Sequence, residues 1–148
     1  MRASIPKMVD ISAKPVIRRE AVAEGTIHLT RSTMKLIEAH GIEKGDPLQI
    51  ASVGAIQAVK STPSSMMMCH PIPIEISTIE FAKKADSITA KVKVVAFSKT
   101  GVEMEALNAV TMALLNIWDV VKKYEKNKSG QYPKTRISDI HVVKKVKG

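Results

Sequence analysis

Aromatic residues are scarce in this chain, which contains two Phe, two Tyr and one Trp among 148 residues. RNA-recognition modules stack bases on exposed aromatic side chains, and no K/R-G-F/Y-G/A-F pattern occurs in the sequence. The scarcity therefore argues against an RNA-binding module. The G-x-G-x-x-G and Walker patterns of glycine-rich phosphate loops are also missing.

Cysteine is nearly absent as well. The single Cys69 excludes an internal disulfide and suits a reducing compartment, and the lack of a second pair of ligands at metal spacing argues against a zinc site. No apolar run approaches the length that spans a membrane, and the N-terminus lacks the apolar core of a signal peptide. We expect a soluble, cytoplasmic protein without a membrane partner.

Positive charge is abundant, because 23 Lys and Arg against 14 Asp and Glu give a net charge of +9. This excess predicts an anionic partner, either nucleic acid or a phosphorylated metabolite, or it serves solubility alone. The chain is long enough to bury a sizeable core. Residues 1–15 contain Pro6 and Pro15 and show no period, so we expect a flexible N-terminal arm and then a single domain over residues 16–148.

The most regular stretch is a helix that begins near Val102. Its apolar residues recur every three or four positions and predict one buried stripe: Val102, Ala106, Ala109, Val110, Ala113, Leu114, Ile117, Val121 and Tyr124. Glu103 and Glu105 fall in the first turn, where carboxylates interact favourably with the helix dipole. Asp119 and Lys122 lie three residues apart near the other end and can pair. Aspartate is a weak helix former, so a purely structural role explains Asp119 poorly.

These two polar pairs share a helix face but lie far apart. At 100° per residue, Glu105 and Asp119 differ by about 40° around the helix, yet they stand about 21 Å apart along its axis. No small molecule spans that distance comfortably. Two different substrates, or one substrate held across a subunit interface, are the remaining alternatives.

The segments before this helix alternate between strand and helix patterns. Val16–Leu29 is β-compatible and interrupted at Gly25. Thr30 can cap a short helix that runs to Ala39 and stops at Gly41.

Asp46 and Pro47 start a second helix, which runs to about Ser61 and is ended by Pro63. It carries a face of small residues suited to close packing: Ala51, Gly54, Ala55 and Ala58. Residues 64–73 are expected to be irregular because of their prolines.

Two β-runs, Ile74–Phe81 and Ile88–Phe97, are spaced as an antiparallel hairpin, and Ile137–Val146 alternates as a last strand. The order β-α-α-β-β-α-β predicts an α+β fold, with a ferredoxin-like antiparallel sheet and helices packed on one face.

Several polar residues have an ordinary structural interpretation beside a functional one. His70 lies between Cys69 and Pro71 in an extended loop, where it can simply satisfy loop hydrogen bonds. Cys69 and His70 make a poor catalytic dyad, since neighbouring side chains in extended backbone point to opposite faces. Glu103 and Glu105 can be helix-dipole partners alone, and the basic segments can be solvated surface.

Five motifs follow one another along the chain: MVDISAK (Met8–Lys14), KGD (Lys44–Asp46), CHP (Cys69–Pro71), KTGVEMEAL (Lys99–Leu107) and WDVVK (Trp118–Lys122). In these motifs the chain closely resembles the cyclic pyranopterin monophosphate synthase family, accessory protein C of molybdenum cofactor biosynthesis. The resemblance covers nearly the whole chain from Met8. KTGVEMEAL followed by W-D-x-x-K is highly specific.

The resemblance implies a ferredoxin-like subunit, a homohexamer built as a trimer of dimers, and a lyase reaction. In that reaction the cyclised dihydro-GTP intermediate (3',8-cyclo-7,8-dihydroguanosine triphosphate) is rearranged to cyclic pyranopterin monophosphate, and pyrophosphate is released. The functional partner is the radical enzyme that makes this intermediate. We expect a reaction without a metal or other cofactor, with a loosely held magnesium ion on the phosphates as the alternative.

The resemblance also implies site residues, position by position. The catalytic residues are Lys44, His70, Glu103, Glu105, Asp119 and Lys122. The substrate-binding residues are Lys14, Arg19, Met68, Cys69, His70, Met104, Glu105 and Lys145. The chain departs from the family pattern at Met66–Met68, where Ile-Pro-Leu is usual, and in the short tail after Lys145.

The implied chemistry needs both cations and proton carriers. Lysine and arginine clamps are expected to hold the triphosphate and to stabilise the departing pyrophosphate, while ring rearrangement requires proton transfer. We expect desolvation and paired charges to bring Lys122 toward its neutral form. We also expect His70 and the two glutamates of one chain to share a pocket with Asp119 and Lys122 of its neighbour. A non-catalytic scaffold is the remaining alternative, and pyrophosphate release distinguishes it from an enzyme.

Overall fold

The computed structural model describes residues 3–148, so that residues 1 and 2 of the predicted arm lie outside the described residues. The elements follow in this order: β1 (Ile17–His28), α1 (Arg31–Glu38), α2 (Pro47–Ser65), β2 (Ile76–Lys84), β3 (Ser87–Ser98), α3 (Glu103–Glu125) and β4 (Arg136–Lys147). The predicted order of strands and helices is confirmed, and most boundaries lie within one to three residues of those predicted.

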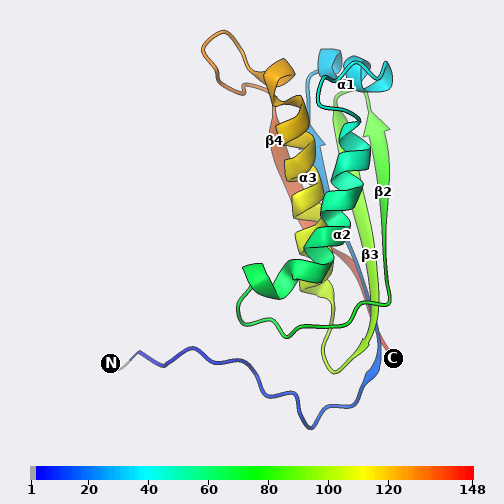
Figure 1. Cartoon of the computed structure of the whole chain (residues 1–148), viewed down its shortest axis with the longest axis vertical. Helices are drawn as coiled ribbons and strands as arrows, with labels where there is room; N and C mark the ends of the chain where they lie inside the picture. The colour runs from blue at the N-terminus through cyan, green and yellow to red at the C-terminus, as the bar shows by residue number, and fades with distance from the viewer. Residues whose placement is uncertain (1–2) are drawn as a thin grey trace.

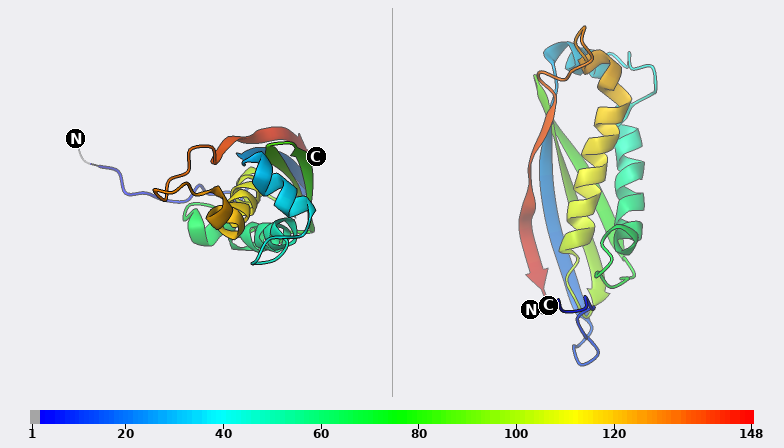
Figure 2. Two further views of the ribbon diagram at one scale, coloured as in Figure 1. Left: turned by 90° about the horizontal axis from the view of Figure 1, so that it is seen from above. Right: turned by 90° about the vertical axis from the view of Figure 1, so that its left-hand side faces the viewer.

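The four strands form one antiparallel sheet in the order β2-β3-β1-β4. The long helices α2 and α3 lie side by side on one face of this sheet, and α1 covers the end at which β1 finishes (Figure 1, Figure 2). The predicted α+β fold, an antiparallel sheet with helices on one face, is confirmed. The two ends of α3 therefore lie at opposite ends of the molecule (Figure 1).

β1 runs unbroken through Gly25, which corrects the predicted interruption at that residue. A Cβ at Gly25 would lie 2.8 Å from Ile140 Cγ1 and 3.0 Å from Leu114 Cδ1. The pairing of β1 with β4 changes register between Glu24 and Thr26. Two residues of β4, Asp139 and Ile140, thus face the single Gly25 in a bulge of β4. Gly25 leaves room for this bulge and for α3 rather than breaking β1.

α1 begins as predicted, with the Thr30 side chain accepting a hydrogen bond in the first turn. Its end differs from the prediction, because His40, with φ of 55°, takes the left-handed conformation expected of Gly41. The His40 N–H donates to Ile37 O at 3.1 Å, and the Gly41 N–H donates to Leu36 O at 2.9 Å. These two bonds satisfy the last carbonyls of the helix and stabilise the left-handed residue.

Pro63 does not end α2, which continues to Ser65. The prediction that residues 64 and 65 are irregular is therefore wrong. A proline so close to the C-terminus removes one backbone hydrogen bond, but the Met66 N–H still donates to Thr62 O at 2.9 Å. The turn that contains Pro63 closes despite the missing donor.

α3 is the central helix of the core, and its predicted stripe is buried except for Tyr124, which is half-buried. The small-residue face of α2 packs against α3, so that a Cβ at Gly54 would lie 2.5 Å from Asn116 Nδ2. By length and composition α3 is also apolar enough to cross a membrane, with half of its most apolar window buried. Packing against the sheet and α2 accounts for this apolar character.

Candidate functional site

An ion-pair cluster lies near the C-terminal end of α3. The Asp119 carboxylate accepts hydrogen bonds from Lys122 Nζ at 2.9 Å and from Lys44 Nζ at 3.1 Å. Lys44 also donates to the backbone carbonyl of Asp119 at 3.2 Å. All three side chains are exposed to solvent. The hydrogen bonds from Lys122 and Lys44 lower the pKa of Asp119, so its carboxylate is charged at neutral pH.

The Lys44-Gly45-Asp46 turn brings Lys44 to this cluster. Gly45 has φ of 118°, a conformation that favours glycine. Asp46 caps α2 by accepting from backbone N–H groups of its first turn. On the other side, the Glu43 N–H donates to the Tyr124 hydroxyl at 2.9 Å. The turn is therefore held between the start of α2 and the end of α3.

Lys122 is not shifted toward its neutral form. Its side chain is 43% exposed, and the hydrogen bond and charge of Asp119 raise its pKa. The predicted shift is wrong for the single chain because the desolvation that it requires is weaker than the attraction of Asp119. Lys122 is a cation, suited to binding anionic oxygen atoms.

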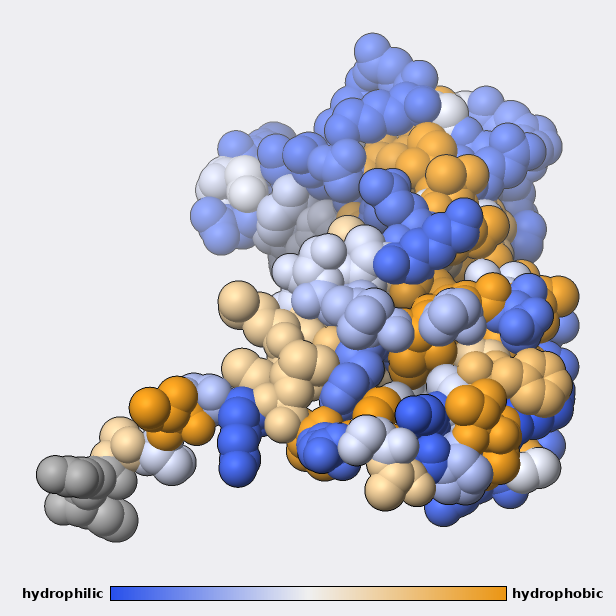
Figure 3. All heavy atoms as spheres, turned by 60° about the horizontal axis from the view of Figure 1, so that its bottom comes forward, coloured by the Kyte–Doolittle hydropathy of each residue, from blue (hydrophilic) through white to orange (hydrophobic). Residues whose placement is uncertain are grey.

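The N-terminal end of α3 borders a pocket of about 410 Å³. Seven predicted site residues line it: Lys14, Met68, Cys69, His70, Glu103, Met104 and Glu105. The prediction that His70 lies with the glutamates is confirmed. Figure 3 looks toward this end of the molecule, where the N-terminal arm projects from the body.

Five further residues complete the pocket and were not among the predicted site residues: Val9, Ile11, Ile72, Thr100 and Gly101. Four of them lie inside the MVDISAK and KTGVEMEAL motifs, so the motifs themselves were the available signal. A Cβ at Gly101 would overlap the Glu103 carboxylate. Glycine at this position therefore leaves Glu103 its place on the pocket wall.

The two glutamates of the pocket differ in their electrostatic environment. Glu105 is only 3% exposed, and burial, together with the charge of Glu103, raises its pKa. Burial also acts to raise the pKa of Glu103, but the Lys145 ammonium that pairs with it brings the value below normal. Glu105 is thus suited to hold a proton, while Glu103 stays charged. The short C-terminal tail still places Lys145 on Glu103.

The Cys69 thiol lies in the same pocket but is poorly placed to react. Burial, and then the charge of Glu105, raise the pKa of Cys69. A thiol with a raised pKa stays protonated at neutral pH and is a weak nucleophile. Cys69 therefore contributes to the pocket wall rather than to covalent chemistry.

Arg19 is 4% exposed in β1 and close enough to Glu103 for its charge to lower the pKa of that carboxyl. Its Nη2 donates to Lys99 O at 3.3 Å, while its Nε has no hydrogen-bond partner among residues 3–148. Neither Arg19 nor Lys145 lines the pocket. Both lie beside Glu103, on the side of the pocket that this carboxylate occupies.

The predicted site residues therefore form two groups within one chain. No pocket residue belongs to the ion-pair cluster, and Glu105 and Asp119 are separated by about 21 Å of helix. Within the part of the chain that the structure describes, no three His, Cys, Asp or Glu side chains form a group that can hold a metal ion.

Comparison with known proteins gives a consistent result. The sequence model described as the MoaC family matches residues 8–148. A protein of Pyrococcus horikoshii is 53% identical over 141 residues, which cover 95% of this chain and 89% of the relative. A protein of Methanosphaerula palustris is 50% identical over 142 residues, with 96% and 92% covered. Both are named probable cyclic pyranopterin monophosphate synthase. A third relative, from Methanothermobacter thermautotrophicus, is 51% identical over 141 residues, with 95% and 89% covered, and is named a probable accessory protein of that synthase. The chain belongs to the MoaC family.

Proposed function

We propose that this chain is a cyclic pyranopterin monophosphate synthase, a lyase of molybdenum cofactor biosynthesis. It converts the cyclised dihydro-GTP triphosphate, supplied by a radical enzyme, into cyclic pyranopterin monophosphate and pyrophosphate. The observation that carries the proposal is the division of the site residues between the two ends of α3. A pocket with a proton-holding glutamate lies at one end, and an exposed pair of lysines lies at the other.

The active site is completed by a second copy of the chain. Each group is open to solvent and incomplete for the reaction, because the pocket contains Glu103 and Glu105, while the two exposed lysines paired with Asp119 lie in the cluster. A two-fold contact can set one end of a helix beside the opposite end of its mate. We infer that His70, Glu103 and Glu105 of one subunit face Lys44, Asp119 and Lys122 of the other.

The cations hold the triphosphate in this arrangement. Lys44 and Lys122 are exposed cations on one carboxylate and can turn ammonium hydrogens toward phosphate oxygens. Lys14 supplies a further ammonium from the arm that lines the pocket, and Arg19 brings a buried guanidinium near Glu103. These charges stabilise the negative charge that develops on the departing pyrophosphate.

Proton transfer falls to the pocket. Two carboxyl groups whose pKa values are shifted in opposite directions are suited to different roles. Glu105, with its raised pKa, donates a proton to the rearranging ring, and Glu103 remains a charged acceptor. His70 lies on the same wall and can relay protons. Lys122 enters the shared site as a cation paired with Asp119.

We propose that the assembly is a homohexamer built as a trimer of dimers, located in the cytoplasm, with no nucleic-acid or membrane partner. Large apolar side chains exposed on α2 and α3 support subunit contacts: Val53, Ile56, Met112 and Leu115. Residues 3–15 are proposed to form an N-terminal arm outside the domain, from which Val9, Ile11 and Lys14 line the pocket. No resident cofactor is proposed. A magnesium ion would arrive on the triphosphate, since Asp119 is already engaged by two lysines.

The proposed function is tested by mixing the purified chain with the enzymatically prepared cyclised dihydro-GTP intermediate. We expect release of one pyrophosphate per pterin formed, measured together. Asp119→Asn serves as the matched inactive control. A folded oligomer that binds the intermediate without releasing pyrophosphate would return the chain to the class of non-catalytic scaffolds.

A further inference from the structure

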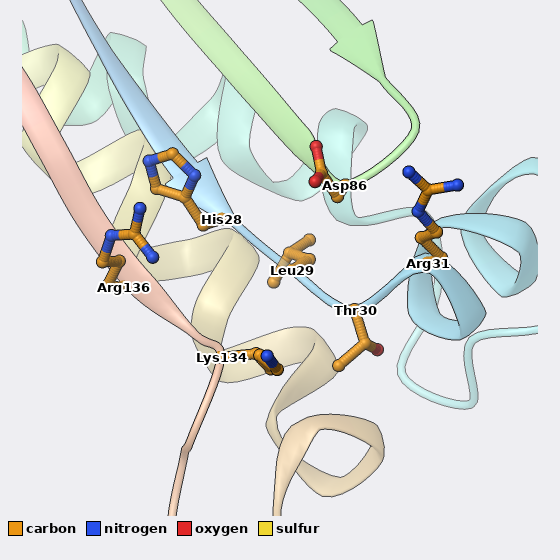
Figure 4. A pocket seen from close by; sticks show the side chains of 7 residues that line it. All are labelled: His28, Leu29, Thr30, Arg31, Asp86, Lys134 and Arg136. Atoms are coloured by element: carbon orange, nitrogen blue, oxygen red, sulfur yellow. The ribbon is translucent and has the colours of Figure 1, made fainter.

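A second cavity, of about 450 Å³, lies where β1 ends and α1 begins. It is lined by His28, Leu29, Thr30, Arg31, Asp86, Lys134 and Arg136 (Figure 4). None of these residues belongs to the pocket at the N-terminal end of α3 or to the Asp119 cluster. The proposed reaction therefore gives this cavity no role.

Three cationic side chains from two segments of the chain line this cavity. Arg31 comes from the first turn of α1, whereas Lys134 and Arg136 come from the loop before β4 and the start of that strand (Figure 4). Within residues 3–148, none of the three forms an ion pair. Among the described residues that line the cavity, Asp86 has the one carboxylate. Glu125 adds a second carboxylate behind Thr30, so three cations face two carboxylates and the net charge stays positive.

The backbone that carries these cations is held in place by a buried carboxylate. Glu125, 4% exposed at the end of α3, accepts hydrogen bonds from Thr30 N–H at 3.0 Å and from the Thr135 hydroxyl at 2.9 Å. Thr30 precedes Arg31, and Thr135 lies between the other two cations. One buried group therefore fixes both segments that contribute positive charge.

The sheet fixes the remaining wall. His28 pairs with Arg136 on one side and with Ser87 on the other, and the Leu29 N–H donates to Asp86 O at 3.0 Å. The His28 ring is hydrogen-bonded to the Ser138 hydroxyl at 2.8 Å. The backbone around the cavity is consequently held in place before any ligand arrives, and a preorganised backbone reduces the entropic cost of binding.

We propose that this cavity is a binding site for a small phosphate-bearing anion, separate from the catalytic site. Its volume lies within the range of small-molecule pockets. Two guanidinium groups and one ammonium offer the charge-assisted, fork-shaped hydrogen bonding that phosphate prefers. Asp86 opposes the anion and weakens its binding. This proposal does not rest on the proposed lyase activity.

Inorganic pyrophosphate is the probe, titrated calorimetrically into the full chain at constant ionic strength. The double variant Lys134→Gln/Arg136→Gln should weaken pyrophosphate binding at this cavity by at least about tenfold. At concentrations that saturate the wild-type site, the titration should then show one bound pyrophosphate fewer per chain. Lys126→Gln/Lys128→Gln removes the same charge at the same end of the molecule but outside the cavity, and it should leave that equivalent intact. Circular dichroism checks that both variants are folded.

Asp86→Asn should change the affinity for pyrophosphate in the opposite direction, and a loss of folding cannot produce tighter binding. Removing the repelling charge should tighten pyrophosphate binding several-fold, whereas Glu80→Gln, on the exposed part of β2, should not. The proposal is overturned if the wild-type chain binds no pyrophosphate that Lys134→Gln/Arg136→Gln removes. It is overturned equally if Lys126→Gln/Lys128→Gln weakens binding as much as Lys134→Gln/Arg136→Gln does. It is also overturned if Asp86→Asn leaves the affinity unchanged.

Discussion

The Lys44 ammonium lies 3.1 Å from the Asp119 carboxylate, although 75 residues separate them in the sequence. Lys122 occupies the other oxygen of the same carboxylate at 2.9 Å. Asp119 therefore positions two exposed cations side by side at the end of α3. In the proposed reaction this arrangement presents both ammonium groups to the substrate phosphates.

Asp119→Asn should abolish most turnover while leaving the fold intact. The asparagine keeps the size of the side chain but removes the charge that holds Lys44 and Lys122 together. Exposed ion pairs contribute little to stability, so thermal unfolding should change little. We expect pyrophosphate release to fall by at least about a hundredfold, the usual scale for an acid–base or positioning group.

The matched control is Glu38→Gln, which removes one exposed carboxylate of α1. It should keep nearly full turnover. If Asp119→Asn, correctly folded, were as active as Glu38→Gln, Asp119 would be an ordinary surface residue.

Triphosphate binding should weaken as salt is added. Lys44 and Lys122 are exposed, and the attraction between exposed charges is screened as the Debye length shortens. Titration calorimetry with a GTP analogue, from about 0.01 M to about 1 M salt, should show a steady loss of affinity. An affinity independent of salt would contradict binding by a clamp of cations.

Glu105→Gln should stabilise the protein at neutral pH. Because the native pKa of Glu105 is raised above its ordinary value of 4.5, the native state retains this proton while the unfolded state has lost it. The free energy of unfolding therefore falls as pH rises from 4.5 through the raised value. Glu105→Gln removes that loss, about 1.4 kcal/mol for each pKa unit of the shift. Urea denaturation at a series of pH values measures the difference.

Glu103→Gln provides the control of opposite sign. The pKa of Glu103 is lowered below 4.5 in the native state, so its charge stabilises the fold above 4.5 and this contribution disappears as pH falls through the native pKa. Glu103→Gln should therefore lower stability at neutral pH. The account is wrong if both substitutions move the urea midpoint in the same direction.

Gly25→Ala should destabilise the fold without altering the chemistry. The added Cβ would meet Ile140 and Leu114 at 2.8 and 3.0 Å in a packed interior. Overpacking of this kind costs about 1–3 kcal/mol, which lowers the melting temperature measured by calorimetry. Ala82→Gly, at an exposed position of β2, is the comparison for an alanine–glycine difference without overpacking, and it should change the melting temperature less. Gly130→Ala cannot serve as the comparison, because Gly130 has φ of 77° and an alanine there would be strained. Unchanged stability of Gly25→Ala would show that the bulge adapts freely.

Periodicity in the sequence was sufficient to predict α3 and its buried stripe, because one face of the helix is continuously apolar. Local rules failed where tertiary contacts decide the outcome. Gly25 was predicted to interrupt a strand, but it accommodates neighbouring side chains. Pro63 was predicted to end α2, but the hydrogen bond from the Met66 N–H to Thr62 O closes the turn that contains Pro63, and the helix runs to Ser65.

In the candidate site, too, the sequence predicted local features but not the tertiary contacts. Spacing placed Glu103 and Glu105 together in the first turn of α3, but it did not predict that one is deeply buried and the other paired with Lys145. The contact between Lys44 and Asp119 joins distant segments, so only the family resemblance brought these residues together. No local pattern links Lys134 and Arg136 with Arg31, because they are about 100 residues apart in the sequence.

The shared active site is the central claim, and subunit complementation tests it most directly. Glu105→Gln disables the pocket, and Asp119→Asn disables the cluster at the other end of α3. Each variant alone should be inactive. The two are mixed under conditions in which subunits exchange, and native mass spectrometry verifies that mixed oligomers have formed.

In a mixed dimer with shared sites, one site combines both defects and the other combines two intact halves. Random pairing makes half of the dimers mixed, so about a quarter of wild-type pyrophosphate release should return. If activity stays at the level of the two parents after exchange has been verified, each site is built within a single chain and the shared-site account is contradicted.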